Sequence, residues 1–167
     1  MEPSFTIRPA LPADAEPIFS ILSEVACQVP IDLSTPERVE KLKAKVDDWC
    51  RGGHSYVAVD EHDVVVGVQL AKKLCWVGKD YIHLTYAGVT AAARGKKVLT
   101  RLIAAEKGRG LALVTQVKPD NKSDMVARLK CYGFQPWPWS DPPSPLQLRL
   151  PVGPGGGRRM LGRNQGT

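Results

Sequence analysis

The sequence lacks any segment long and apolar enough to cross a membrane as a helix. None of its apolar runs approaches the roughly 18 consecutive residues that a membrane span needs. The N-terminal stretch MEPSFTIRPALPAD has no basic region followed by an apolar one, so no secretory signal is visible. Of the 167 residues, 43% are hydrophobic and 24% are charged, which is enough to bury a core. We therefore expect one folded domain over residues 1–152, located in the cytoplasm.

Cysteine is scarce, and its four positions are scattered. They form no CxxC pair, and no histidine stands at zinc-ligand spacing from any of them. The four are Cys27, Cys50, Cys75 and Cys131. Such a distribution is typical of free thiols in a reducing compartment. We accordingly expect no metal site.

Acidic residues are missing from the last segment, GPGGGRRMLGRNQGT, where Arg158, Arg159 and Arg163 meet no carboxylate. Its composition predicts a disordered Gly/Arg-rich tail over residues 153–167. The whole chain carries a net charge of +6, and a basic protein attracts polyanions such as phosphorylated cofactors or nucleic acid. No basic stripe interleaved with aromatic residues is present, so nucleic-acid binding through the tail is the weaker alternative.

The hydrophobic pattern changes its period along the chain and predicts the element order β-α-α-β-β-β-α-β-α-β. The predicted helices span residues 13–26, 36–50, 98–106 and 121–132. The predicted strands span residues 5–9, 55–74 (a hairpin turning at 61–63), 81–89, 111–117 and 146–150. Thr35 reads as the N-cap of the second helix. A strand meander followed by a strand-helix-strand crossover implies a single α/β (α+β) domain with a mixed central sheet flanked by helices.

The stretch GVTAAARGKKVLTRLI, residues 88–103, joins a strand to a helix through a turn with one glycine and three cations. The first amides of a helix have no intrahelical partners, and the helix dipole makes them an anion site. Arg94, Lys96 and Lys97 add full positive charges there. Cations are slightly unfavourable in a first turn, which favours a bound anion. The alternative is an ordinary helix start with solvated charges.

This junction and the element order resemble the GNAT superfamily, the GCN5-related N-acetyltransferases, over roughly residues 5–150. The family's cofactor loop reads V-x-x-x-x-R/Q-x-x-G-x-G/A, and Val89 and Arg94 stand at the expected separation. Lys97 and Leu99 occupy its two later small positions, so the chain departs from the pattern there. The family's second motif is matched by NKSDMVARLKCYGF, from Asn121 to Phe134.

The resemblance implies direct transfer of an acetyl group from acetyl-CoA to a primary amine. It points to the backbone of Ala87, Gly88 and Val89 as the holder of the acyl carbonyl. The expected cofactor-binding set is Ala87, Gly88, Val89, Arg94, Gly95, Lys96, Lys97, Val98 and Asn121. A homodimer is an arrangement that the resemblance allows.

Two side chains are candidates for the acid–base chemistry. His83 carries the only neutral-pH titrating side chain on the strand at 81–89, so it is the candidate base. Many relatives carry a tyrosine at the position of Leu129, and Tyr132, one turn later, is the candidate acid. A histidine satisfied by its neighbours and a tyrosine packed in the core are the alternatives.

The lost glycines leave a second function open. The chain could be a catalytically degenerate GNAT-like domain that binds CoA or a partner. For the enzyme, the amine could belong to a small metabolite, an aminoglycoside-like drug, a protein N-terminus or lysine, or an aminoacyl-tRNA.

Overall fold

The computed structural model describes residues 4–29, 31–76, 78–117, 124–136 and 146–150. Within these ranges the elements follow the predicted order, with one additional short strand, β6 (Gln135–Pro136), before the last. The predicted single α/β domain, with a mixed sheet flanked by helices, is confirmed. Asn121 and the predicted tail at 153–167 lie outside the described residues.

The N-terminal part of the domain is a strand followed by two helices. Strand β1 (Phe5–Pro9) leads through the 3-10 turn η1 (Pro12–Asp14) into α1 (Ala15–Glu24), and α2 (Pro36–Arg51) follows. The hydroxyl of Thr35 accepts a hydrogen bond from the backbone amide of Arg38 at 3.3 Å, so the predicted cap is confirmed. Helix α1 is shorter than the predicted 13–26, since its first turn is 3-10 and residues 25–29 form turns.

The rest of the chain builds most of the sheet and two further helices. The elements are β2 (Tyr56–Asp60), β3 (Val65–Trp76), β4 (Lys79–Val89), the 3-10 turn η2 (Ala91–Ala93), α3 (Val98–Lys107), β5 (Ala112–Val117), α4 (Met125–Cys131) and β7 (Leu146–Leu150). The predicted turn between β2 and β3 is confirmed. There the Asp60 carboxylate accepts from the amides of His62 and Val64 at 2.9 and 3.0 Å.

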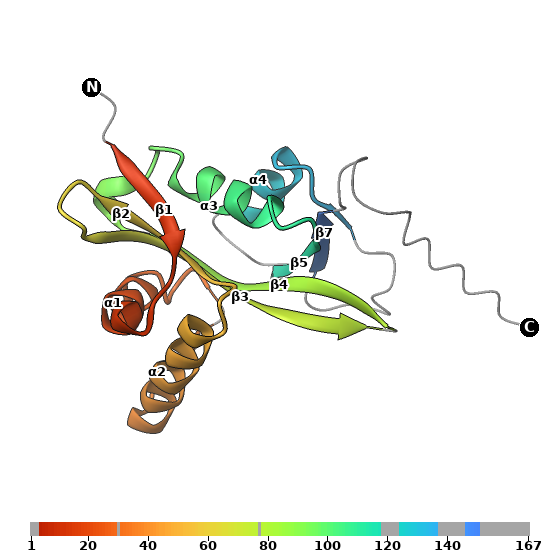
Figure 1. Ribbon diagram of the computed structural model, residues 1–167. Coiled ribbons are helices and arrows are strands. Elements are labelled where there is room, and N and C mark those ends of the chain that lie inside the picture. The colour runs from red at the N-terminus through yellow and green to blue at the C-terminus, as the bar shows by residue number, and fades with distance from the viewer. Residues whose placement is uncertain (1–3, 30, 77, 118–123, 137–145, 151–167) are drawn as a thin grey trace, which may run out of the picture.

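The seven strands lie in the order β1-β2-β3-β4-β5-β7-β6. Every neighbouring pair is antiparallel except β4 and β5, which are parallel and joined by the crossover helix α3. Figure 1 shows α1 and α2 on one face of the sheet, with α3 and α4 on the other. Among the described strands, the parallel pair therefore lies beside the predicted cofactor junction.

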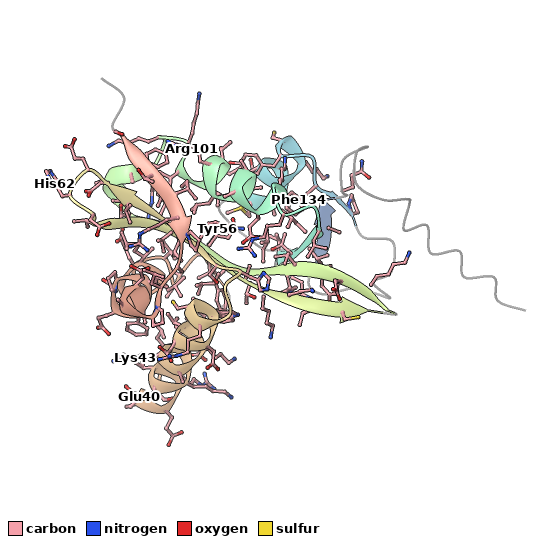
Figure 2. All side chains as sticks on the ribbon, in the orientation of Figure 1. Glu40, Lys43, Tyr56, His62, Arg101 and Phe134 are labelled. Carbon is pink, nitrogen blue, oxygen red and sulfur yellow. The ribbon has the colours of Figure 1, made fainter. Side chains whose placement is uncertain are left out.

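Apolar side chains fill both interfaces between sheet and helices. On the α1 and α2 side, Ile18, Leu22 and Val46 are fully buried against β2 and β3. On the other side, Ile103 and Phe134 belong to the cluster between the sheet and α3 and α4; Figure 2 labels Phe134 there. No helix of the described residues combines the length and the apolar character of a membrane span.

Candidate active site

Strands β4 and β5 separate part-way along their length. Their parallel pairing runs from Tyr81 opposite Ala112 to Leu84 opposite Thr115. Beyond this point β4 continues to Val89, paired with β3 alone among the described strands. A strand directs its backbone groups alternately to its two sides, so those of residues 85–89 that face away from β3 meet no strand there. Except for the Val89 carbonyl, which accepts a hydrogen bond from Arg94 Nε, this backbone is available to a ligand.

A β-bulge marks the point of separation. Tyr86 pairs with Leu70 and Leu84 pairs with Ala71, so Thr85 has no opposite residue on β3. A bulge of this kind bends its strand and redirects the side chains around it. At the last paired position of β4 and β5, the Thr115 hydroxyl donates a hydrogen bond to the Leu84 carbonyl at 3.1 Å.

A cleft lies in the gap between the two strands. It is lined by the strands, by α3 and α4, and by the chain just after α1: Gln28, Val29, Gln69, Leu84, Thr85, Tyr86, Ala87, Leu99, Ile103, Thr115, Gln116, Val117, Met125 and Leu129. None of these side chains carries a charge. Helices α3 and α4 cover one face of the sheet and α1 covers the other, so elements from both faces contribute to the lining.

The predicted base, His83, reaches the cleft through a neighbour. Its ring Nδ1 lies 3.1 Å from the hydroxyl oxygen of Thr85, which lines the cleft. Burial of the ring, and secondly the charge of Lys72, hold the pKa of His83 below its ordinary value. The imidazole is therefore neutral near pH 7 and able to accept a proton.

The N-terminus of α3 opens at the cleft without a side-chain cap. No side chain bonds its first amides, and no acidic residue stands in its first turn. Leu99, in that same turn, lines the cleft. Lys96 and Lys97, which precede this turn, are exposed, and neither side chain forms an ion pair with another described residue. Lys96 lines a second hollow, to which Asp60 and Glu61 also contribute. Unbonded amides, the helix dipole and nearby cations are the features that favour an anion at a helix start.

The two substituted glycine positions behave differently. Lys97 has φ 60° and ψ 21°, the left-handed conformation that favours glycine, and its side chain is exposed to solvent. A lysine therefore adopts here the backbone conformation that glycine favours. Leu99 instead turns into the cleft and packs against the buried cluster that includes Ile103. Its side chain thus forms part of the cleft wall.

Arg94 is held in place by two contacts within the protein. Its Nε donates to the Val89 carbonyl at 3.3 Å, and its Nη2 lies 3.7 Å from the carboxylate of Glu24. The same Glu24 oxygen accepts from the backbone amide of Ala91 at 3.1 Å. Glu24 ends α1, so it ties the loop after β4 to this helix. A phosphate bound at the loop would interact with the same Arg94 guanidinium that already contacts the Glu24 carboxylate.

The remaining described residues of the predicted cofactor set have distinct structural positions. Ala87 lines the cleft. A Cβ atom at Gly88 would lie 2.9 Å from Cγ2 of Ile21, so this glycine allows α1 to pack on β4. Gly95 has φ 79° and forms the loop's turn, while Val98 is buried against the sheet. The described members of the set thus belong to the junction, but only some of them line the cleft.

Tyr132 lies apart from His83 and from the cleft lining. Its hydroxyl accepts a hydrogen bond from the Thr100 hydroxyl at 3.1 Å, and its carbonyl accepts one from Lys107 Nζ at 3.0 Å. The residues of α4 that line the cleft are Met125 and Leu129. A role for Tyr132 as an acid stays a prediction, and Asn121 lies outside the described residues.

Gln69 is a cleft residue that the sequence reasoning missed. It is 1% exposed on β3, and neither its Nε2 nor its Oε1 has a hydrogen-bond partner among the described residues. Buried amides in native proteins are nearly always paired. In the sequence, Gln69 could have been recognised as the one polar side chain within the apolar run VVVGVQLA, residues 64–71.

Comparison with solved structures identifies the architecture. A crystal structure described as histone acetyltransferase HPA2 and related acetyltransferase, from Corynebacterium glutamicum, is 22% identical at a TM-score of 0.64 and covers 91% of this chain and 97% of its own. A GNAT family acetyltransferase from Listeria monocytogenes is 15% identical at a TM-score of 0.66, with coverages of 87% and 93%.

The chain has the GNAT fold. A third GNAT-fold structure, the PaiA N-acetyltransferase of Thermoplasma acidophilum in complex with coenzyme A, is 16% identical at a TM-score of 0.61 and covers 87% of this chain and 98% of its own. No protein-family model and no curated protein matches the sequence. At these identities the likeness concerns the fold alone.

Proposed function

We propose that the chain is an acetyl-CoA-dependent N-acetyltransferase that transfers the acetyl group directly to a primary amine. The observation that carries this proposal is the uncapped, basic N-terminus of α3 opening onto an uncharged cleft between β4 and β5. The basic helix start suits phosphate groups, and the uncharged cleft suits a neutral chain. CoA combines a phosphorylated part with a neutral arm. The coenzyme A bound to the PaiA structure supports the same assignment.

The loop and the first turn of α3 would bind the pyrophosphate of CoA. The free amides at the helix start donate to phosphate oxygens, and Arg94, Lys96 and Lys97 supply charge. The backbone of residues 85–89 that faces the gap would bind the neutral arm and the acyl carbonyl. A preorganised amide aimed at a developing oxyanion contributes on the order of 3 kcal/mol to the rate.

Acetyl-CoA supplies an activated acyl group as a thioester. The amine nitrogen forms a bond to the acyl carbon, the carbon–sulfur bond breaks, and its electron pair leaves with the sulfur. The amine gives up one proton, which passes through the Thr85 hydroxyl to Nδ1 of His83, its hydrogen-bonded neighbour. A thiolate whose conjugate acid has a pKa of about 8.5 leaves readily near neutral pH, so the transfer does not depend on an acid at Tyr132.

Isothermal titration of CoA and acetyl-CoA into the purified protein tests the proposal. We expect binding that Arg94→Ala weakens about tenfold, because a charged hydrogen bond to phosphate is lost. Arg51→Ala is the matched control, since Arg51 pairs with Asp47 on the exposed side of α2. Absence of binding by the wild-type protein up to millimolar ligand would overturn the proposal.

A second candidate is a GNAT-like domain that binds CoA or a partner without catalysis. The replacement of both small loop residues by Lys97 and Leu99, the latter turned into the cleft, favours it. Restoring glycine at both positions separates the two candidates. An enzyme limited by crowding gains affinity for CoA, whereas a surface repurposed for a partner shows no gain.

A further inference from the structure

The side-chain amide of Gln69, on β3, has no hydrogen-bond partner among the described residues. Its backbone is placed by pairing with Tyr56 on β2 and with Ala87 on β4. Its side chain is 1% exposed and lines the cleft, yet both Nε2 and Oε1 lack partners among the described residues. Burying an amide without hydrogen bonds costs free energy, which a ligand in the cleft can recover.

The position of Gln69 indicates which part of a ligand it meets. Its directly opposite residue on β4 is Ala87, whose small side chain leaves room in front of the amide. Thr85, the bulged residue that contacts His83, lines the same cleft. The free amide is thus beside the strand segment where the acyl group and the proton acceptor of the proposed transfer would meet.

Resting on the proposed function, we propose that Gln69 binds the acyl group of acetyl-CoA, with Nε2 donating a hydrogen bond to the thioester carbonyl oxygen. Oε1 then faces the position from which the amine arrives and accepts one of its N–H groups. Gln69 neither takes nor gives a proton in this arrangement. Free CoA has no thioester carbonyl, so the contact distinguishes acetyl-CoA from the product.

Titration of both ligands into Gln69→Met tests this assignment. Methionine has a similar volume but no hydrogen-bonding amide. We expect the affinity for acetyl-CoA to fall about tenfold while the affinity for CoA is unchanged. In thermal melts of the free protein, Gln69→Met should melt at the same temperature as the wild type or higher, because an unpaired buried amide has been removed.

Gln116→Met is the matched control, because Gln116 lines the same cleft from β5 but is exposed. It should change neither affinity. Equal affinities of Gln69→Met and wild type for acetyl-CoA would overturn the role of Gln69 and leave the proposed function standing. Equal weakening of both ligands would place the amide on the CoA arm and also overturn it. Failure of the wild type to bind either ligand would overturn both proposals.

A measurement on the wild-type protein covers the case in which Gln69→Met does not fold. The side-chain amide protons of Gln69 can be followed by nuclear magnetic resonance in protein labelled with ¹⁵N. They should shift on addition of acetyl-CoA and remain in place on addition of CoA. The same shift with both ligands, or with neither, would contradict the acyl contact.

Discussion

At the scale of single residues, Glu106 on α3 shows how a buried carboxyl group couples stability to pH. It is fully buried, and neither oxygen has a hydrogen-bond partner among the described residues. Arg109 Nε lies 3.8 Å from its Oε2 and donates to the Tyr56 hydroxyl at 3.0 Å; Figure 2 shows Tyr56 between the sheet and α3. Burial raises the pKa of Glu106 to about 7, against the lowering effect of Arg109.

A raised pKa in the folded state stabilises the protein only while the group is protonated. The contribution is complete below the ordinary pKa of 4.5 and is lost as the pH rises through about 7. We expect the free energy of unfolding of the wild type to fall between pH 5 and pH 8, by up to about 3 kcal/mol. Glu106→Gln should remove most of this fall, as measured by urea unfolding at the two pH values. Glu40→Gln, at an exposed site on α2, should leave this fall in the free energy of unfolding unchanged. An equally large fall in Glu106→Gln would contradict the role of the Glu106 carboxyl group.

His83 leads to a second prediction at this scale. Because the pKa of His83 is held below its ordinary value of 6.5, the imidazole is still neutral at that pH. The rate of acetyl transfer should therefore fall only at more acidic pH, where the ring becomes protonated. His83→Gln should lower the rate at pH 7 about 100-fold and abolish the acidic limb of the pH profile. His62→Gln, at the exposed hairpin turn, serves as the control. A retained acidic limb in His83→Gln would assign the base to another group.

At the scale of elements, two glycines set the approach of helices to the sheet. A Cβ atom at Gly67 would lie 2.6 Å from Cγ1 of Val98, the first residue of α3. The start of α3 therefore sits directly on β3, which fixes the anion site relative to the cleft. Gly88 plays the same part for α1 on the opposite face.

Gly67→Ala should displace the start of α3. The expected cost is about 1–3 kcal/mol in the free energy of unfolding, because the contact is with a buried side chain that has little room to move. Affinity for CoA should fall with it. Gly52→Ala is the control, since its Cβ would meet only backbone oxygens at 3.5 Å and its φ is −70°. Urea unfolding and CoA titration measure both effects; equal stability of the two variants would contradict the packing argument.

The elements were largely predictable from the sequence because each carries its own periodicity. Thr35 capped its helix as predicted, and the crossover from β4 through α3 to β5 follows from local pattern alone. Contacts between distant elements were not predictable. The bulge at Thr85 depends on the register between β3 and β4, and Glu24 meets Ala91 across 67 positions of sequence. The position of Gln69 in the cleft was not predictable either, because it depends on which strand lies beside β3.

At the scale of the whole molecule, the net charge of +6 favours the capture of a polyanion. CoA binding should weaken as salt rises, because screened cations attract phosphates less. The loss between about 50 and 300 mM salt should be smaller for Arg94→Ala than for the wild type, as titration calorimetry can measure. Equal salt dependence would remove Arg94 from the phosphate site.

The lining of the cleft by elements from both faces of the sheet bears on how the two reactants would meet. A site lined by elements from both faces would receive one molecule from the side of α3 and α4 and a second from the side of α1. Both would then be bound together before any bond changes, as direct transfer requires. Steady-state plots at several fixed concentrations of one reactant should intersect rather than run parallel. A single molecule joining CoA covalently to the true amine would span the sheet and be the strongest inhibitor of this protein.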